Sequence, residues 1–367
     1  MTVRIATFNI ENLITRFDFT GYRNQLRSDR VLKLFDIKSE GLYHQLEAAR
    51  IVAATDDTRQ MSALAIADAA ADILCLQEVD SMEALQAFEY GYLFRMVGSG
   101  YRQKYLVEGN DSRGIDVAVL MREETRFGEK IEVRDVTSHS ALTYHDLGLY
   151  SVDLGPGVKP QDKIFKRDCL ELDLRIGGRP LRLYVVHFKS MTGRGEGDGR
   201  ELTRPVREAE ARAVRHIIEN QCGGRADRCN FMICGDMNDY QERVEVIGDR
   251  SSGFRFVVRD GLKSALDVFS ADGFAENVMN RRDALDRWTL YHARGPEEQH
   301  LCQLDYVWLS PALAAANPLA VPNIIRAGQP FRTPFPPGQE VDRYPRTGWD
   351  RPKASDHCPV AISLHLP

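Results

Sequence analysis

The sequence contains no uninterrupted apolar stretch of about 18 residues, so it predicts no membrane-spanning helix. Its first residues, from Met1 to Asn9, lack a basic segment followed by an apolar segment and a cleavage site, so no secretory signal is predicted. The net charge of −5 excludes a histone-like protein held to nucleic acid by bulk positive charge, although it leaves room for a local basic patch.

Cysteine is scarce and scattered. The 7 cysteines include no Cys-x-x-Cys pair, so a thiolate zinc site is not predicted. Four of them lie in apolar, strand-like runs, where a reduced thiol acts as a small hydrophobic side chain. Cys222 and Cys229 flank a Gly-Gly loop and could form a disulfide, but free thiols are the favoured interpretation. Reduced cysteines predict a cytoplasmic protein.

The composition is that of a folded globular protein, with 43% hydrophobic and 28% charged residues, which excludes wholesale disorder. Helical periodicity covers 58–72 and a second segment that has Pro205 near its start. Apolar runs and period-two alternation predict strands at 3–10, 73–79, 114–121, 170–176, 181–188, 230–234, 304–309 and 360–366. This mixture predicts the α/β class: a four-layer α/β/β/α sandwich of two mixed, largely antiparallel sheets with helices outside.

We expect the whole chain, residues 1–367, to form a single domain, because one large sandwich can accommodate that length. Segments without periodic patterns predict long loops at 16–40, 138–163, 189–203 and 323–354. Loops of this length in a compact domain are usually functional or disordered.

Polar residues recur where predicted strands begin or end, at positions that a strand core avoids. Taken singly, each has an ordinary explanation, such as a turn cap or a hydrogen-bonded core side chain. Their recurrence in one chain instead indicates a shared site. The set is Asn9, Glu11, Glu78, His187, Asp236, Asn238, Asp305, Asp356 and His357.

The residue types in this set suit the hydrolysis of a phosphate ester. Carboxylate and amide oxygens are ligands for a hard cation, Mg²⁺ or Mn²⁺. A histidine beside a carboxylate stays protonated and can contact a charged oxygen. The cation and the imidazolium would neutralise charge growing on the phosphate oxygens. No Gly-x-Ser-x-Gly elbow, P-loop or Gly-x-Gly-x-x-Gly signature competes with this interpretation.

The ordered motifs resemble the endonuclease/exonuclease/phosphatase superfamily, and in particular its bacterial nuclease-like branch. The resemblance spans nearly the whole chain. It rests on Thr7-Phe-Asn-Ile-Glu-Asn12, Leu76-Gln-Glu78, Arg113-Gly-Ile-Asp-Val-Ala-Val-Leu120, Val186-His-Phe-Lys-Ser190, Cys234-Gly-Asp-Met-Asn238, Leu304-Asp-Tyr306 and Ser355-Asp-His-Cys-Pro-Val360. The signature of the inositol phosphatase branch is missing, and a histidine, His187, stands where abasic-site endonucleases have a tyrosine.

The resemblance implies a role for each residue of the set. Glu78 would be the principal metal ligand, with Asn9 and Glu11 beside it and Asp356 completing the metal or water site. Asp236 would orient or deprotonate the attacking water, and Asn238 would position that water or bind the phosphate. His187 and His357 would contact phosphate oxygens, with Asp305 holding His357 in its charged orientation.

Several further residues are candidates for binding the substrate. Arg113 and Lys189 could contact phosphate, although each could equally be a solvated charge at a strand end. The segment 323–354 carries six basic and three acidic residues interleaved with aromatic side chains. Such a loop can follow a phosphate backbone and stack bases, close over a small phosphorylated metabolite, or simply be pinned to the core by its aromatics. From it we select Arg343, Tyr344 and Trp349.

The sequence therefore predicts a metal-dependent enzyme that hydrolyses phosphodiester bonds, with DNA or RNA as the favoured substrate. The alternative within the same chemistry is a phosphatase or phosphodiesterase acting on a small metabolite or a lipid headgroup. A non-catalytic binding module is a third possibility, but it would be expected to have lost part of the set, and every position is filled. The sequence gives no indication of oligomeric state.

Overall fold

A computed structural model describes residues 2–13, 39, 41–42, 56–111, 113–193, 197–295 and 298–367. The loop predicted at 16–40 lies outside these residues, apart from Ser39. In the described part, no helix is long and apolar enough to cross a membrane.

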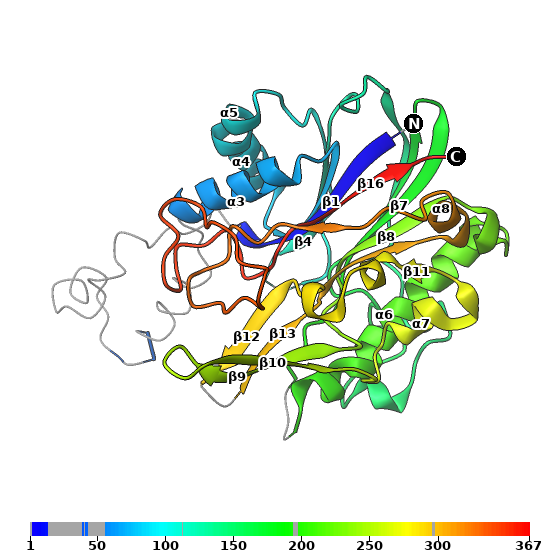
Figure 1. Cartoon of the computed structure of the whole chain (residues 1–367). Coiled ribbons are helices and arrows are strands. Elements are labelled where there is room, and N and C mark those ends of the chain that lie inside the picture. The colour runs from blue at the N-terminus through cyan, green and yellow to red at the C-terminus, as the bar shows by residue number, and fades with distance from the viewer. Residues whose placement is uncertain are drawn as a thin grey trace.

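Two six-stranded sheets face each other in the centre of the molecule (Figure 1). The first sheet has the order β15-β16-β1-β2-β4-β3 and the second has the order β11-β14-β8-β7-β6-β5. Within the described strands, β1 pairs in parallel with β2 and β7 with β8, whereas the other pairings are antiparallel. The strands of the first sheet are β1 (Thr2–Leu13), β2 (Ile73–Val79), β3 (Gln103–Leu106), β4 (Asp116–Met121), β15 (Asn323–Ile324) and β16 (Val360–His365); those of the second are β5 (Ile131–Ser138), β6 (Cys169–Ile176), β7 (Arg179–His187), β8 (Phe231–Asp236), β11 (Glu276–Asn277) and β14 (Asp305–Leu309).

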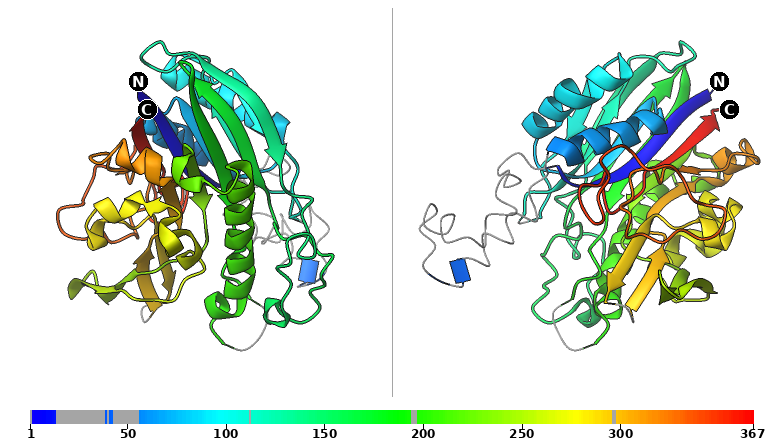
Figure 2. Two further views of the ribbon diagram at one scale, coloured as in Figure 1. Left: turned by 90° about the vertical axis from the view of Figure 1, so that its right-hand side faces the viewer. Right: turned by 60° about the vertical axis from the view of Figure 1, so that its left-hand side comes forward.

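Helices cover the outer face of each sheet. The first sheet is covered by α3 (Asp56–Ala69), α4 (Met82–Phe88), the π-helical turn Glu89–Leu93 and α5 (Phe94–Val97). The long helix α6 (Gly199–Gln221) and α7 (Asp267–Ser270) cover the second sheet, as Figure 2 shows. α8 (Pro311–Ala315) and the 3₁₀ turns Val152–Leu154, Ala226–Arg228, Ala271–Gly273, Val278–Arg281 and Ala284–Asp286 lie in the connections. The predicted α/β/β/α sandwich is therefore confirmed.

Apolar side chains form one core between the sheets and another under each helical layer. Val119 and Ile5 from the first sheet meet Leu172 and Val185 from the second, because alternate residues of each strand point inward. At Gly235 the backbone has φ of +142°, and a Cβ atom there would lie 1.9 Å from the Val186 carbonyl oxygen. Only glycine allows β8 to pass β7 this closely.

A third sheet, which the sequence patterns did not predict, lies beside the sandwich. It has the order β10-β9-β13-β12, with β9 (Arg243–Asp249), β10 (Gly253–Arg259), β12 (Leu290–Arg294) and β13 (Glu298–Cys302). Figure 1 shows it below the two large sheets. Val244 and Leu301 attach it to the core between the main sheets.

Some predicted boundaries were wrong. α6 begins at Gly199, so Pro205 lies inside the helix rather than near its start, and the loop predicted at 189–203 is shorter than expected. The loop predicted at 323–354 opens with the short strand β15, and the one predicted at 138–163 contains the 3₁₀ turn Val152–Leu154.

The interpretation of all cysteines as free thiols was also wrong. Cys222 and Cys229 form a disulfide just after α6, whereas Cys75, Cys169 and Cys234 are buried free thiols, as are Cys302 and Cys358. Disulfides are rare in a reducing cytoplasm. The cytoplasmic location therefore stays a prediction, and the cysteines no longer support it.

Candidate active site

The predicted catalytic residues converge because of how the strands are paired. β7 and β8 are parallel, so His187 and Asp236 lie side by side at their carboxyl ends. β14 is antiparallel to β8, so its first residue, Asp305, lies opposite Asp236. Adjacent strands are about 4.8 Å apart, which places all three side chains within reach of one another.

The first sheet supplies the opposite half of the site by the same geometry. β1 and β2 are parallel and bring Asn9 next to the end of β2, where Glu78 lies. β16 is antiparallel to β1, so His357, just before β16, comes to the same edge. Both sheets thus direct their polar strand ends toward one place.

Asp236 is the centre of the cluster. Its Oδ2 atom accepts a hydrogen bond from Asn9 Nδ2 at 2.9 Å and lies 3.5 Å from His187 Nε2 and 3.7 Å from His357 Nε2. Its Oδ1 atom accepts the backbone N–H of Asn238 at 2.9 Å. Burial raises the pKa of Asp236 to about 6, although the charge of His357 opposes that shift.

The two histidines have opposite electrostatic surroundings. Burial alone would lower the pKa of His357, but the carboxylates of Asp305, 2.8 Å from its Nδ1, and Asp236 raise it well above the usual range. Burial, together with the charges of Arg167 and His357, lowers the pKa of His187. His357 is therefore an imidazolium at neutral pH and His187 a neutral ring. Neighbouring groups whose pKa values are shifted in opposite directions are typical of acid–base sites.

The donor atoms around Glu78 suit a hard cation. No three His, Cys, Asp or Glu side chains in the described ranges form a ready-made metal cage. Mg²⁺ usually takes only one or two carboxylates and keeps several waters, so a sparse set is compatible with it. Burial, with the nearby charges of Asp356 and Asp236, raises the pKa of Glu78 to about 7. Crowded acidic groups of this kind, with the Asn9 amide beside them, fit a divalent cation.

The backbone is strained where these side chains are presented. Glu11, Asn12, Glu78 and Asn238 have φ between 49° and 67°, in a region that residues other than glycine seldom adopt. Such strain concentrates at functional sites, where the surrounding structure enforces it. Asn238 is held further by a hydrogen bond from its Nδ2 to the Phe188 carbonyl oxygen at 3.1 Å.

A cleft of about 740 Å³ opens above this cluster. Of the predicted residues, those lining it are Glu78, Arg113, His187, Asp236, Asn238, Asp356 and His357. Asn9 and Asp305 are buried directly behind them, at 2% and 0% exposure.

The cleft contains further residues that the sequence analysis missed. Arg167 is buried, pairs with Asp111 at 2.9 Å and donates to the Phe188 carbonyl oxygen, beside His187. Arg200, in α6, and Tyr240, in the segment after β8, also line the cleft. His292 and His300 line it from the third sheet. No sequence motif points to Arg167. The alternation of His292 and Arg294 with Tyr291 and Ala293 could have predicted the strand β12.

The structure does not bring every predicted residue to the cleft. The Glu11 carboxylate pairs with Lys353 at 3.1 Å and with Arg351, and it accepts the backbone N–H of Asp356. Lys189 donates to the carbonyl oxygens of Ser190 and Thr192. These two residues brace the loops around the site.

The three residues chosen from the segment 323–354 also lie elsewhere. Arg343 stacks on Phe335, 4.4 Å from the ring centroid, and donates to backbone carbonyl groups. The Tyr344 hydroxyl donates to Asp68, on α3. Trp349 is exposed and lies under Arg250, at 4.3 Å. Their predicted role in binding substrate is therefore not supported by their positions.

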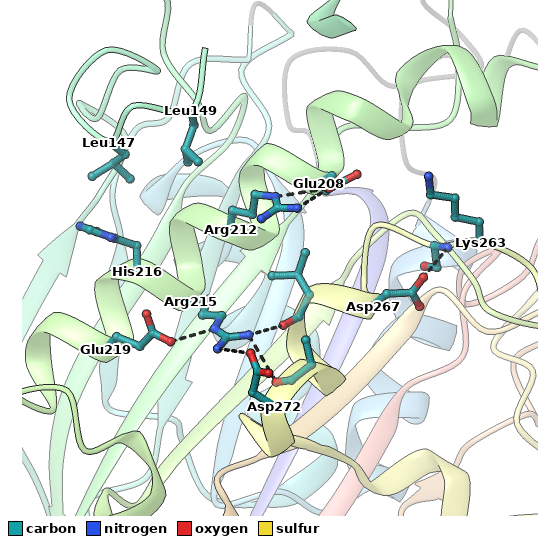
Figure 3. Close-up of a pocket in the computed structure, with 13 residues that line it drawn as sticks. Leu147, Leu149, Glu208, Arg212, Arg215, His216, Glu219, Lys263, Asp267 and Asp272 are labelled. Carbon is teal, nitrogen blue, oxygen red and sulfur yellow. Dashed lines mark hydrogen bonds and ion pairs between the residues drawn. The ribbon is translucent and has the colours of Figure 1, made fainter. Parts of the chain in front are cut away.

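A second hollow lies on the outer side of α6, away from the strand ends (Figure 3). Its charged groups are paired with one another: Arg212 contacts Glu208, and Arg215 contacts Glu219 and Asp272. It holds none of the predicted catalytic residues, so the cleft is the candidate active site.

Comparisons with known proteins agree with this assignment of the fold. The sequence profile of the endonuclease/exonuclease/phosphatase family matches residues 6–357. Among curated proteins, none matches the sequence significantly.

Solved structures resemble the chain over its full length. The human Nocturnin catalytic domain has a TM-score of 0.51 and 14% identity, covering 100% of this chain and 95% of that one. A family protein from Bacteroides thetaiotaomicron has a TM-score of 0.53 and 14% identity, covering 99% and 97%. A mannosyl-6-phosphatase from the same organism has a TM-score of 0.50 and 12% identity, covering 99% and 99%. At these identities the likeness shows the fold alone.

Proposed function

The chain belongs to the endonuclease/exonuclease/phosphatase family of metal-dependent phosphoric ester hydrolases, and from that premise we propose that it cleaves phosphodiester bonds by activated-water attack. One observation carries the proposal: Asp236 Oδ2 lies at the floor of the cleft within 3.7 Å of both His187 Nε2 and His357 Nε2. The carboxylate can accept a proton from water, and the two imidazoles beside it can donate hydrogen bonds to phosphate oxygens, as this hydrolysis requires.

In this proposal Asp236 orients the attacking water and accepts its proton. Asn238 is attached to the same carboxylate through its backbone N–H, so it can hold the water or a phosphate oxygen beside Asp236. His357, kept charged by Asp305, donates a hydrogen bond to the oxygen on which negative charge develops. His187, as a neutral ring, offers an N–H to another phosphate oxygen without adding charge.

Glu78, Asn9 and Asp356 would hold Mg²⁺ or Mn²⁺. Arg113 and Arg167, which line the same cleft, would contact the phosphate. When bound, the cation would supply Lewis-acid stabilisation of the phosphate oxygens. Glu11 supports this group indirectly, because its carboxylate binds the backbone N–H of Asp356 at 2.9 Å.

Nucleic acid is the first candidate substrate, because the cleft extends well beyond the space that one phosphate needs. A small phosphorylated metabolite is the second candidate. The basic and aromatic residues predicted to follow a nucleic-acid backbone, Arg343, Tyr344 and Trp349, are engaged away from the cleft, and one structural relative is a mannosyl-6-phosphatase. Cytoplasmic location and binding of DNA or RNA are part of the proposal.

The test is hydrolysis of a substrate panel with Mg²⁺, Mn²⁺ or EDTA: single- and double-stranded DNA, RNA, bis-4-nitrophenyl phosphate, 4-nitrophenyl phosphate and sugar phosphates. We expect cleavage of diesters that EDTA abolishes and that Asp236→Asn lowers by about 10²-fold or more. The matched control is Asp227→Asn, since Asp227 is an exposed aspartate before the start of β8, at the opposite end of that strand from Asp236.

Two results would change the proposal. Full metal-dependent activity in Asp236→Asn would contradict the assigned role of Asp236. Activity confined to monoesters would favour the small-metabolite phosphatase over the phosphodiesterase.

A further inference from the structure

One face of the third sheet forms a wall of the cleft. Side chains of a strand alternate between faces, and Leu290, His292 and Arg294, which share one face of β12, all line the cleft. Leu290 forms a β-bridge with His357, so this face continues outward from the catalytic cluster. His300 on β13 lies directly opposite His292 and lines the same wall.

His300 presents its ring edge to the cleft. Its exposed fraction is 7%, it lines the cleft, and neither of its ring nitrogens is among the enclosed atoms without a partner in the described residues. The nitrogens therefore reach the cleft, where a bound molecule can hydrogen-bond to them. Burial, followed by the charges of His292 and Arg243, lowers the pKa of His300 to about 4. The ring is neutral at pH 7, so one nitrogen can donate and the other can accept.

The surroundings of His300 are aromatic rather than purely cationic. The ring centroids of His292 and His300 are 4.8 Å apart, and Tyr240 lies 6.2 Å from His300 on the other side. Arg200 covers the Tyr240 ring at 4.4 Å. Arg243, the nearest cation on β9, is partly compensated by Glu245 at 3.4 Å. This wall is therefore a poor place for a bare phosphate and a good one for a planar ring with polar edges.

We propose that the His292–His300 pair, with Tyr240, is a subsite for a planar nitrogen heterocycle, the base of a nucleoside esterified to the scissile phosphate. The proposal rests on the proposed phosphodiesterase function. His300 hydrogen-bonds to the polar edge of the base, and His292, on the edge strand β12, packs beside the same base with the ring edge that it turns to the cleft. His292 is two residues beyond Leu290, about 7 Å along the strand, which leaves room for a sugar between phosphate and base.

The experiment compares three esters that release the same 4-nitrophenolate: thymidine 5′-(4-nitrophenyl phosphate), its abasic deoxyribose counterpart and methyl 4-nitrophenyl phosphate. We expect kcat/KM for the thymidine ester to exceed that for the abasic ester by about tenfold or more. His300→Phe keeps the ring contacts but removes the nitrogens, and His292→Ala removes the neighbouring ring that packs against the base. Each should bring the ratio of the two values close to one.

The control is His216→Ala, because His216 is exposed on α6 in the outer hollow, and its ratio should stay at the wild-type value. Melting temperatures show whether each variant folds; if His300→Phe does not, the more exposed His292→Ala carries the test. Equal hydrolysis of the thymidine and abasic esters by the wild type would overturn the subsite while leaving the phosphodiesterase intact. Hydrolysis of none of the three esters would instead overturn the proposed function.

Discussion

Two arginines and one aspartate form a buried ion-pair network between α6 and the segment that follows β8, and its removal provides a quantitative test of the structure. Arg207 and Asp239 are both 0% exposed, with Nε and Oδ2 3.3 Å apart. Arg200 joins them with a contact of 2.7 Å to Asp239 Oδ1. Asp239 directly follows Asn238, so the network attaches the segment after β8 to α6.

The expected costs differ because the partners left behind differ. Removing one member of a buried ion pair typically costs about 3–5 kcal/mol. Arg207→Met leaves Asp239 with Arg200 and the backbone N–H of Ala265 at 3.0 Å, so we expect about 3 kcal/mol. Asp239→Asn leaves two buried guanidinium groups without their shared counter-charge, so we expect about 5 kcal/mol.

Urea unfolding followed by tryptophan fluorescence measures these differences, because Trp288 and Trp308 are each 1% exposed and report on the core. The control is Arg212→Met, which removes an exposed pair with Glu208 on the same helix and should cost about 0.5 kcal/mol or less. The reasoning is refuted if Arg207→Met costs no more than the control, or more than Asp239→Asn.

Three further perturbations test other parts of the structure. Asp305→Asn removes a carboxylate that raises the pKa of His357, so the alkaline limb of the pH–rate profile should move to lower pH. A limb that does not move would contradict the role proposed for Asp305 in keeping His357 charged. The pKa of Glu210 is raised to about 7 by burial, so this group destabilises the fold as pH rises from about 4.5 to 7. Glu210→Gln should therefore reduce the stability difference between pH 5 and pH 8 by up to about 3 kcal/mol, measured by urea unfolding at both values. Gly235→Ala should cost about 3 kcal/mol or more in the same assay, because its Cβ would meet the Val186 carbonyl oxygen; a neutral substitution would contradict the packing of β7 on β8.

The sandwich, and the meeting of the candidate catalytic residues, were predictable because both depend on local patterns. A strand buried on both faces is a continuous apolar run, as residues 73–76 of β2 are, and the polar residues that end it, here Gln77 and Glu78, can be read directly. Polar residues at the ends of such runs must lie at a sheet edge. Because His187 and Asp236 each end a strand, the sequence already indicated that they lie near each other.

Composition did not indicate whether the side chains of a segment point toward the cleft or toward the rest of the protein. The segment 323–354 is rich in arginine and aromatic residues, but its side chains bind the protein itself: Arg343 lies between aromatic rings, and Arg351 reaches Glu11. A guanidinium stacked on a core aromatic and one that grips phosphate have the same sequence signature. The long-range contact decides, and a single sequence does not contain it.

In the proposed enzyme, recognition and chemistry come from different sheets of one cleft. The proposed catalytic side chains lie at the ends of buried strands, where two parallel pairs and their antiparallel neighbours fix the geometry. The wall that holds His292 and His300 comes from an edge hairpin that contributes none of these groups. A change in β12 or β13 can therefore alter which ester arm is accepted while the arrangement around Asp236 stays the same. It follows that differences in substrate among proteins with this sandwich are to be sought in such walls, since the strand ends are constrained by the chemistry they perform.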